Sequence, residues 1–397
     1  MKNKKWMAIL LGGIMAASLA APCSVSAAEK TTLTFWHAMG GTNGEVLQQI
    51  VDDFNASQDE IEVKAEYQGT YDDTITKLKA AMQSDSGLPD VCQMYDVGTK
   101  FMYDSGAVIP VEDKFESTGY DKSSVMDVIS SYYTVDGKQY AMPFNVSTPM
   151  LYYNKDVFEA AGLDPETPPT TYDEVLEDAK KIVESGAAPV GYSQAIYGWF
   201  FEQQLAGLGV TYGNNDNGRT EAVTAVDFDS NGGGLKVFDM WKKLYDSGYF
   251  EDYGTTTADT QTAFFSGQVG MIIESTAILK NAVDSSPFEV GTGYLPRIEQ
   301  NDEGGVIIGG GSLWLTDTGN EANEDAAWKF IEYITTPDVQ AKWSMGTGYF
   351  AINEKAYETD DMKAYLKENP NFETAINQLK DSPVNCNTAG VLSGVQT

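Results

Sequence analysis

The first part of the chain alternates short apolar runs with longer amphipathic segments. Residues 33–36, 61–67 and 91–95 show the continuous or alternating apolar pattern of buried strands. Between them, residues 46–54 and 75–82 place apolar side chains at helical spacing. This β-α-β-α-β order predicts a parallel sheet covered by helices, and therefore an α/β protein.

Polar and glycine-rich segments follow each of the three predicted strands. They are residues 40–42, 68–71 and 96–99. The carboxyl ends of parallel strands meet at one edge of a sheet, so we expect a ligand to bind at that edge. A later apolar strand at 306–315 contains three consecutive glycines, which indicates that a ligand or another backbone segment approaches closely there.

The middle of the chain contains loops of two kinds. The segment 164–171 carries three prolines and ends in a helix cap, ahead of a helix expected around 175–182. The glycine- and asparagine-rich segments 213–218 and 231–234 are expected to be surface loops. With 397 residues, the chain is long enough for two domains.

The N-terminus has the order of a secretory signal peptide. Three lysines within residues 2–5 precede an apolar run from 6 to 21, and small residues follow at 25–28. This order predicts cleavage after Ala27, so that residues 1–27 form the signal peptide. We therefore expect an exported protein, in the periplasm or on the outer face of the cytoplasmic membrane.

The cysteines bear on anchoring and on disulfides. Cys23 offers the alternative of a lipid anchor, but Pro22 stands where such a signal normally has a small residue. Ordinary secretion is therefore the favoured prediction. After cleavage only Cys92 and Cys386 remain, too few for a disulfide framework, and two free thiols are expected.

Charge and histidine content narrow the possible functions. The chain has 26 Lys and Arg against 58 Asp and Glu, and this formal charge of −32 argues against nucleic acid as a partner. His37 is the only histidine, so a multi-histidine metal site is impossible, and neither a metal nor another cofactor is expected. Because His37 follows an aromatic strand, we expect it to make a hydrogen bond at the strand end. No motif indicates a catalytic residue.

The residue types at the strand ends suit a small hydroxylated ligand. Aromatic rings stack on C–H surfaces, while hydroxyl, N–H and carboxylate groups bind ligand oxygens. We therefore expect a monomeric, secreted protein that binds a small polar molecule. Two hypotheses of other classes stay open: a secreted carbohydrate-active hydrolase that uses two carboxylates, and a cell-surface adhesion module.

Six motifs, in order along the chain, resemble the family 1 extracellular solute-binding proteins of ABC importers. They are residues 35–39, 143–149, 152–156, 161–165, 307–314 and 347–349. The resemblance covers the chain after the signal peptide and is closest to members that bind sn-glycerol-3-phosphate. It implies a two-lobed periplasmic-binding-protein (Venus flytrap) fold with helices on both faces of a mostly parallel sheet in each lobe. It also implies an ABC permease in the membrane as partner.

The resemblance further implies how the chain divides between the lobes. Residues 28–140 would form lobe 1, with about 275–330 returning to it, and residues 141–274 would form lobe 2, with about 331–397 returning to it. In the family the chain continues into a C-terminal helix, and a phosphate-clamping arginine would fall a few residues past the last residue here. We therefore expect that helix to be missing.

Seven ligand-binding residues are carried over from the family's glycerol-phosphate pocket: Tyr71, Asp96, Ser147, Trp199, Ser275, Gly310 and Tyr349. The carboxylate, which replaces a glutamate of the family, is expected to accept hydrogen bonds from glycerol hydroxyls. The serines, the tyrosines and the glycine N–H are expected to donate to phosphate oxygens, and the tryptophan to form an aromatic wall.

Departures from the family pattern bear on the choice of ligand. Ile196 stands where close relatives have a second tryptophan, which predicts a wider pocket for a bulkier ligand such as glycerophosphocholine. Neither Arg219 nor Arg297 matches the phosphate-clamping position. The favoured ligand is thus glycerol-3-phosphate or a glycerophosphodiester, and the alternative is a neutral oligosaccharide.

Overall fold

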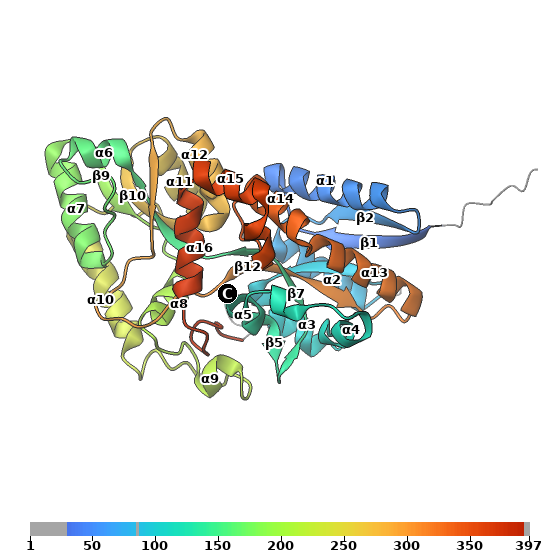
Figure 1. The fold of residues 1–397 in the computed structure, drawn as a ribbon. Helices are drawn as coiled ribbons and strands as arrows, with labels where there is room; N and C mark the ends of the chain where they lie inside the picture. Colours follow the sequence, from blue (N-terminus) through green and yellow to red (C-terminus); the bar gives the residue numbers. More distant parts are fainter. Residues whose placement is uncertain (1–29, 85–86, 393–397) are drawn as a thin grey trace, which may run out of the picture.

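The computed structural model describes residues 30–84 and 87–392 and folds them into two α/β lobes, each with its own sheet (Figure 1). The two-lobed α/β fold expected from the sequence is confirmed. The predicted signal peptide, 1–27, and the alternative anchor Cys23 lie outside the described residues. Within the described part of the chain, no helix is long and apolar enough to cross a membrane.

The first lobe is built around a six-stranded sheet in the order β2-β1-β3-β12-β4, in which β7 also pairs with β12. Its strands are β1 (Thr31–His37), β2 (Ile61–Tyr67), β3 (Val91–Tyr95), β4 (Val108–Ile109), β7 (Met142–Ser147) and β12 (Gly309–Thr316). β1 runs parallel to β2 and β3, whereas β12 runs antiparallel to β3, β4 and β7. A short hairpin of β5 (Thr134–Val135) and β6 (Lys138–Gln139) lies outside this sheet.

Amphipathic helices cover the first sheet. α1 (Gly41–Ser57) buries the apolar face that its sequence predicts and contacts β2, and α2 (Tyr71–Met82) contacts β3. α13 (Glu321–Ile334) packs on β1 and β12, and α14 (Pro337–Thr347) packs on α1. The shorter helices of this lobe are α3 (Thr99–Ser105), α4 (Glu112–Thr118) and α5 (Asp127–Ser130).

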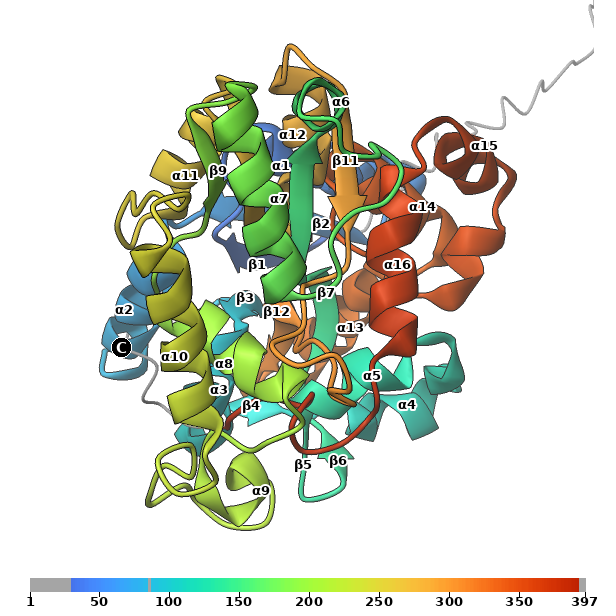
Figure 2. The ribbon, with the colours of Figure 1, turned by 90° about the vertical axis from the view of Figure 1, so that its left-hand side faces the viewer.

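The second lobe contains a four-stranded sheet in the order β11-β8-β10-β9. Its strands are β8 (Pro149–Asn154), β9 (Val190–Ser193), β10 (Val269–Ser275) and β11 (Val290–Gly293). The remaining helices are α6 (Lys155–Ala160), α7 (Tyr172–Ser185), α8 (Gly198–Gly207), α9 (Asn214–Gly218), α10 (Gly233–Asp246), α11 (Thr257–Phe265), α12 (Leu279–Ser285), α15 (Asp360–Glu368) and α16 (Asn371–Asp381). Figure 2 shows α7 and α10 at the front of this lobe and α16 beside β11.

Both sheets are mixed, which corrects the expectation of mostly parallel sheets. β12 runs against each of its three partners in the first sheet, and β8 runs against both of its partners in the second. The reason is the connection between the lobes. β12 and β8 each follow a segment that crosses between the lobes. Each strand therefore begins at the side of its sheet where the crossing arrives and runs away from it: β12 starts beside the end of β3, and β8 starts beside the end of β10.

The division of the chain between the lobes also differs from the expected one. β7 pairs in the first sheet, so the first crossing lies at Thr148 rather than near residue 140. β11 belongs to the second sheet, so the return to the first lobe begins after residue 293 rather than near 275. α13 and α14 pack on the first lobe, whereas residues beyond 331 were expected in the second. Long-range strand pairing and helix packing, which leave no local signal, set these boundaries.

Gln378 of α16 makes hydrogen bonds to two of the segments that cross between the lobes. The N–H of Leu295 donates to Gln378 Oε1 at 2.5 Å, and Gln378 Nε2 donates to the carbonyl of Pro149 at 2.7 Å. The same Nε2 lies 3.3 Å from Thr148 Oγ1. One buried amide therefore joins the start of β8 to the segment that follows β11.

Candidate functional site

Three of the seven predicted ligand-binding residues contact one buried residue, Asn145 in β7, and a fourth, Asp96, lies close enough to Tyr71 for its charge to act on it. Asn145 Nδ2 donates to Tyr71 Oη at 2.7 Å. Tyr349, which follows α14, makes side-chain hydrogen bonds to Asn145 and Tyr71. Gly310 passes so close that an added Cβ would lie 1.9 Å from the carbonyl oxygen of Asn145. The charge of Asp96 contributes to the raised pKa of Tyr71, whose main cause is burial. We call these five residues the Asn145 cluster.

The glycines in β12 make this approach possible. Gly310 has a φ of +100°, a left-handed backbone conformation that favours glycine. A Cβ on Gly311 would lie 2.8 Å from Asn145 Oδ1 and 3.0 Å from the carbonyl oxygen of Met94. The register of β12 against β7 shifts just after Gly311, as in a β-bulge. The prediction that these glycines mark a close backbone approach is confirmed, and the approaching strand is β7.

Asp96 opens the 3₁₀ turn Asp96–Gly98 at the end of β3 and is only 9% exposed. Burial raises the pKa of its carboxyl to about 7, although hydrogen bonds from the N–H groups of Val97 and Asp96 itself act to lower it. A carboxyl with this pKa titrates near neutral pH. It therefore accepts hydrogen bonds as a carboxylate above pH 7 and offers an O–H donor below it.

Ser147 of the first lobe and Trp199 of the second lobe both lie next to Gly309, the first residue of β12. Ser147 is buried and pairs with Gly309 across the β7–β12 ladder. Trp199 of α8 lies against Gly309, where an added Cβ would be 2.8 Å from Trp199 Cζ2. The indole Nε1 of Trp199 is buried and has no hydrogen-bond partner among the described residues. A buried N–H without a partner at the junction of the lobes is a donor that a ligand can satisfy.

Ser275 lies at the end of β10, beside the first crossing. Its Oγ accepts from the N–H of Ala277 at 3.2 Å, and its carbonyl accepts from Tyr152 Oη at 2.7 Å. The next residue donates its N–H to the carbonyl of Thr148 at 2.8 Å. The structure thus assigns Ser275 a capping contact, and its predicted contact with ligand stays a prediction.

Sequence reasoning missed several buried polar groups. Asn145 and Gln93 are fully buried amides in strands, and a polar side chain within an apolar strand is the signal that could have found them. Tyr197 precedes α8, and the charges of Glu274 and Asp96 contribute to its raised pKa after burial. A carboxylate from each lobe therefore lies near this one tyrosine. Only the tertiary structure brings these groups together.

Three further predictions concern single residues. His37 ends β1, and its Nδ1 accepts from the N–H of Met39 at 3.3 Å, so the predicted strand-end hydrogen bond is confirmed. Cys92 and Cys386 are free thiols, as expected. Ile196 contributes to a separate apolar cavity of about 240 Å³, and its predicted effect on ligand size remains a prediction. Among the described residues, no group of three or more His, Cys, Asp or Glu side chains could hold a metal ion.

Arg219 makes contacts that join the lobes. It follows α9, and its guanidinium donates to the carbonyls of Tyr132 at 2.8 Å and of Gly390 at 3.2 Å, and also to that of Ala389. The guanidinium carbon also lies 5.2 Å from the centre of the Tyr132 ring. These contacts give the arginine a structural role near residues 389–390.

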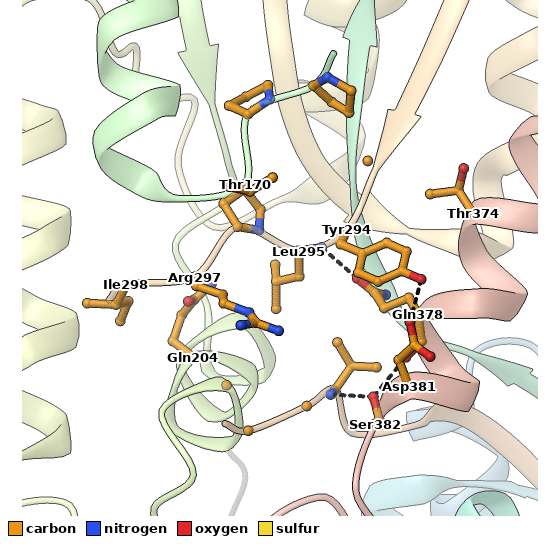
Figure 3. Close-up of a pocket in the computed structure, with 18 of the residues that line it drawn as sticks. Thr170, Gln204, Tyr294, Leu295, Arg297, Ile298, Thr374, Gln378, Asp381 and Ser382 are labelled. Atoms are coloured by element: carbon orange, nitrogen blue, oxygen red, sulfur yellow. Dashed lines mark hydrogen bonds between the residues drawn. The ribbon is translucent and has the colours of Figure 1, made fainter. Parts of the chain in front are cut away.

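A larger cavity, of about 540 Å³, lies in the second lobe beside the crossing segment that follows β11 (Figure 3). Figure 3 shows the Arg297 side chain on one side of it and Gln378 and Asp381 on the other. Tyr294 Oη donates to Asp381 Oδ2 at 2.8 Å. None of the seven predicted ligand-binding residues lines this cavity, so it is distinct from the Asn145 cluster.

The sequence profile of a known family decides the identity. The profile described as bacterial extracellular solute-binding protein matches residues 49–374. The chain belongs to this family. The solute-binding protein is 33% identical over 390 residues to the sn-glycerol-3-phosphate-binding periplasmic protein UgpB of Brucella abortus, covering 96% of this chain and 89% of the relative. It is 31% identical to UgpB of Escherichia coli K12, covering 89% of this chain and 81% of that one.

Solved structures of solute-binding proteins share the fold. UgpB from Mycobacterium tuberculosis in complex with glycerophosphocholine superposes with a TM-score of 0.78 at 23% identity, covering 89% of this chain and 87% of that one. The cyclic alpha-maltosyl-1,6-maltose binding protein from Arthrobacter globiformis superposes with a TM-score of 0.75 at 27% identity, covering 91% and 90%. The recognition of the family from sequence motifs is confirmed.

Proposed function

We propose that this protein captures glycerol-3-phosphate or a glycerophosphodiester outside the cell and delivers it to an ABC permease. The observation that carries the proposal is the clustering of an acceptor, Asp96, with the donors Tyr71 and Tyr349 around one buried amide. Glycerol hydroxyls need acceptors, and phosphate oxygens need donors. The relatives named for sn-glycerol-3-phosphate binding support the same class of ligand.

In this proposal each predicted residue has a chemical role. Asp96 accepts hydrogen bonds from the glycerol hydroxyls. Tyr71 and Tyr349 donate to acidic oxygens, and the Nε1 of Trp199 adds a donor from the second lobe. Ser147, Ser275 and the N–H of Gly310 complete the proposed set: two hydroxyls and one backbone N–H at the strand ends.

The ligand would act as a bridge between the lobes. Asp96 and Tyr71 belong to the first lobe and Trp199 to the second. A molecule that contacts both sides stabilises the closed arrangement, because the open one offers only half of the contacts. The protein then works by binding and release without chemical change, which makes it a receptor and not a hydrolase.

The charge of the site favours a diester over a monoester. None of the seven predicted residues is a lysine or an arginine, and neither is Asn145. A phosphate monoester carries about 1.5 to 2 negative charges at pH 7, whereas a diester carries one, so the neutral donors named here satisfy a diester more fully than a monoester. A glycerophosphodiester such as glycerophosphocholine is therefore the preferred ligand, consistent with the ligand of the M. tuberculosis relative.

A neutral oligosaccharide is the second candidate. The likeness to the Arthrobacter globiformis protein, at 27% identity and a TM-score of 0.75, favours it. The same donors and acceptors also suit sugar hydroxyls, and aromatic rings such as Trp199 suit sugar C–H faces.

A thermal-shift and calorimetric screen of the exported protein tests the proposal. The probes are glycerophosphocholine, sn-glycerol-3-phosphate, glycerol and two disaccharides. At 100 times its Kd, a true ligand adds about 2.7 kcal/mol to the free energy of unfolding. Binding of a disaccharide alone would overturn the proposal in favour of the second candidate, and conversion of a bound glycoside into products would support the hydrolase hypothesis.

We also propose that the protein is exported as a monomer after cleavage behind Ala27. The charged, apolar and small-residue order of residues 1–28 supports export. Mass spectrometry of the exported protein would find a new N-terminus at Ala28, and a diacylglycerol-modified Cys23 would contradict it in favour of the lipid anchor. Size-exclusion chromatography with light scattering checks the monomer.

A further inference from the structure

We infer that a relay of buried amides, from the N–H of Ala38 through Gln93 and Asn145 to Tyr71, makes the tyrosine pair Tyr71–Tyr349 a hydrogen-bond donor toward the ligand. The inference rests on the proposed function and deepens it, because it states which ligand group these tyrosines select. That group is an acceptor oxygen, such as an acidic phosphoryl oxygen. Asn145 then acts as a positioning residue for ligand specificity.

The contacts of the relay form one continuous chain. The backbone N–H of Ala38 donates to Gln93 Oε1 at 2.8 Å. Gln93 Nε2 donates to Asn145 Oδ1 at 2.6 Å. Asn145 Nδ2 donates to Tyr71 Oη at 2.7 Å. The chain thus runs from the segment after β1, through β3 and β7, to the first residue of α2.

The direction of every bond follows from the first one. A backbone N–H only donates, so Gln93 must turn its oxygen toward Ala38 and its nitrogen toward Asn145. Asn145 must then present its oxygen to Gln93 and its nitrogen to Tyr71. The usual ambiguity between the oxygen and the nitrogen of an amide is therefore removed for both side chains.

Water cannot replace a partner and allow either amide to flip, because the side chains of Gln93 and Asn145 are inaccessible to solvent. Gln93 and Asn145 are both 0% exposed. Gly310 and Gly311 close the space over Asn145, since an added Cβ on either would approach its atoms within 1.9 and 2.8 Å. Flipping one amide would leave two buried donors facing each other, and each unsatisfied group costs about 1–3 kcal/mol.

The relay ends on hydroxyl groups whose protons point away from it. Tyr71 Oη already accepts from Asn145, so its own proton is available to another acceptor. Tyr349 makes side-chain hydrogen bonds to Asn145 and Tyr71, so its hydroxyl belongs to the same hydrogen-bonded group. At most one of the two hydroxyl protons is used between the tyrosines, so the pair still offers at least one O–H proton to the ligand.

This polarity divides the cluster into two ends. The tyrosine end donates, and Asp96, when ionised, accepts. A ligand with hydroxyls at one end and an acidic oxygen at the other matches both ends in one orientation only. The relay therefore gives the protein both a preference for an acceptor group and a direction of ligand binding.

A double-mutant cycle between Asn145→Leu and Tyr71→Phe tests the relay, with glycerophosphocholine as the probe. Each single variant is expected to weaken binding about tenfold, the equivalent of 1.4 kcal/mol. The double variant is expected to bind no more than twofold more weakly than Tyr71→Phe, because Asn145 acts through the tyrosine. Additive losses of about a hundredfold would overturn the relay.

A second variant keeps the test valid if Asn145→Leu fails to fold. Asn145→Asp preserves the size of the side chain and turns an acceptor toward Tyr71. Its negative charge weakens anion binding directly, but that effect is present in both the Tyr71 and the Tyr71→Phe backgrounds and cancels in the cycle. The remaining coupling is expected to be about tenfold, and a coupling below twofold contradicts the relay.

The result is distinguishable from failure of the proposed function. If the wild-type protein binds glycerophosphocholine and the cycle is additive, only the relay is wrong. If the wild-type protein binds only a disaccharide, the proposed function is wrong, and the same cycle run with that sugar still tests the relay. A purely structural role of Asn145 would lower the unfolding temperature without coupling to Tyr71.

Discussion

Trp199 of the second lobe lies against Gly309 of the first, with its Cζ2 only 2.8 Å from the place where a Cβ on that glycine would stand. The contact joins α8 to the end of β12, beside Ser147. A residue without a side chain is therefore required where the lobes meet. The indole N–H of Trp199 has no hydrogen-bond partner among the described residues. In the proposed closure it binds the ligand, and the fit against Gly309 holds the indole in place for that contact.

The first prediction concerns this contact. Gly309→Ala is expected to weaken glycerophosphocholine binding about tenfold, because the added methyl displaces Trp199 from the closed arrangement. Isothermal titration calorimetry measures the loss. Gly198→Ala is the matched control, since nothing lies within 4 Å of a Cβ at that position. Equal affinities of the two variants would show that the Trp199–Gly309 fit does not govern binding.

The second prediction concerns the pH dependence of binding through Asp96. Its pKa in the folded protein is about 7, so roughly a tenth of the molecules carry the carboxylate at pH 6. If the carboxylate accepts from ligand hydroxyls, the affinity for glycerophosphocholine rises up to tenfold from pH 6 to pH 8. The diester has no group that titrates in this range, unlike a phosphate monoester with its second pKa near 6.

Asp96→Asn supplies the control for that measurement and a second readout. Its binding is expected to be weak and independent of pH between 6 and 8. The raised pKa means that the folded state binds the proton more tightly than the unfolded chain, so this carboxyl lowers stability as pH rises from about 4 to 7. The Asn variant is therefore expected to be more stable than wild type at pH 8 by urea unfolding. A less stable variant would contradict the buried, uncompensated carboxyl.

The third prediction concerns His37, the only histidine. Burial lowers its pKa to about 4 in the folded protein, whereas the unfolded chain titrates near 6.5. The unfolded state therefore binds more protons between these values, and stability falls as pH decreases from 6.5 to 4, by at most about 3 kcal/mol. His37→Gln is expected to lose less stability than wild type over this range. Parallel stability curves of the two proteins would rule out a neutral, buried imidazole.

The fourth prediction concerns the amide that joins the crossing segments. Gln378→Leu leaves the N–H of Leu295 and the carbonyl of Pro149 without their present partner, and we expect a loss of about 3 kcal/mol in the free energy of unfolding. The exposed Gln300→Leu serves as the control, with an expected change within about 0.5 kcal/mol. Equal urea midpoints of the two variants would show that the Gln378 bonds contribute nothing to stability.

Much of the first lobe could be predicted from local patterns. The strands β1, β2 and β3 and the helices α1 and α2 lie where apolar periodicity placed them, because a 2-residue or 3.6-residue repeat is a property of neighbouring residues. The segment 213–218 was less predictable. It was expected to be a loop and forms the short turn α9, with left-handed backbone conformations at Asn215, Asp216 and Asn217.

The sequence by itself determined the α/β class, the family and the chemical types available for a ligand, since these follow from short motifs and local periodicity. Only the tertiary structure decided the antiparallel direction of β12, the first-lobe position of α14 and the relay through Asn145. The reason is distance along the chain. Gln93 and Asn145 are 52 residues apart, and Asn145 and Tyr71 are 74 apart, so no local pattern records their contact. The donors and acceptors were visible in the sequence, but their direction depends on a backbone N–H that only the fold brings to Gln93.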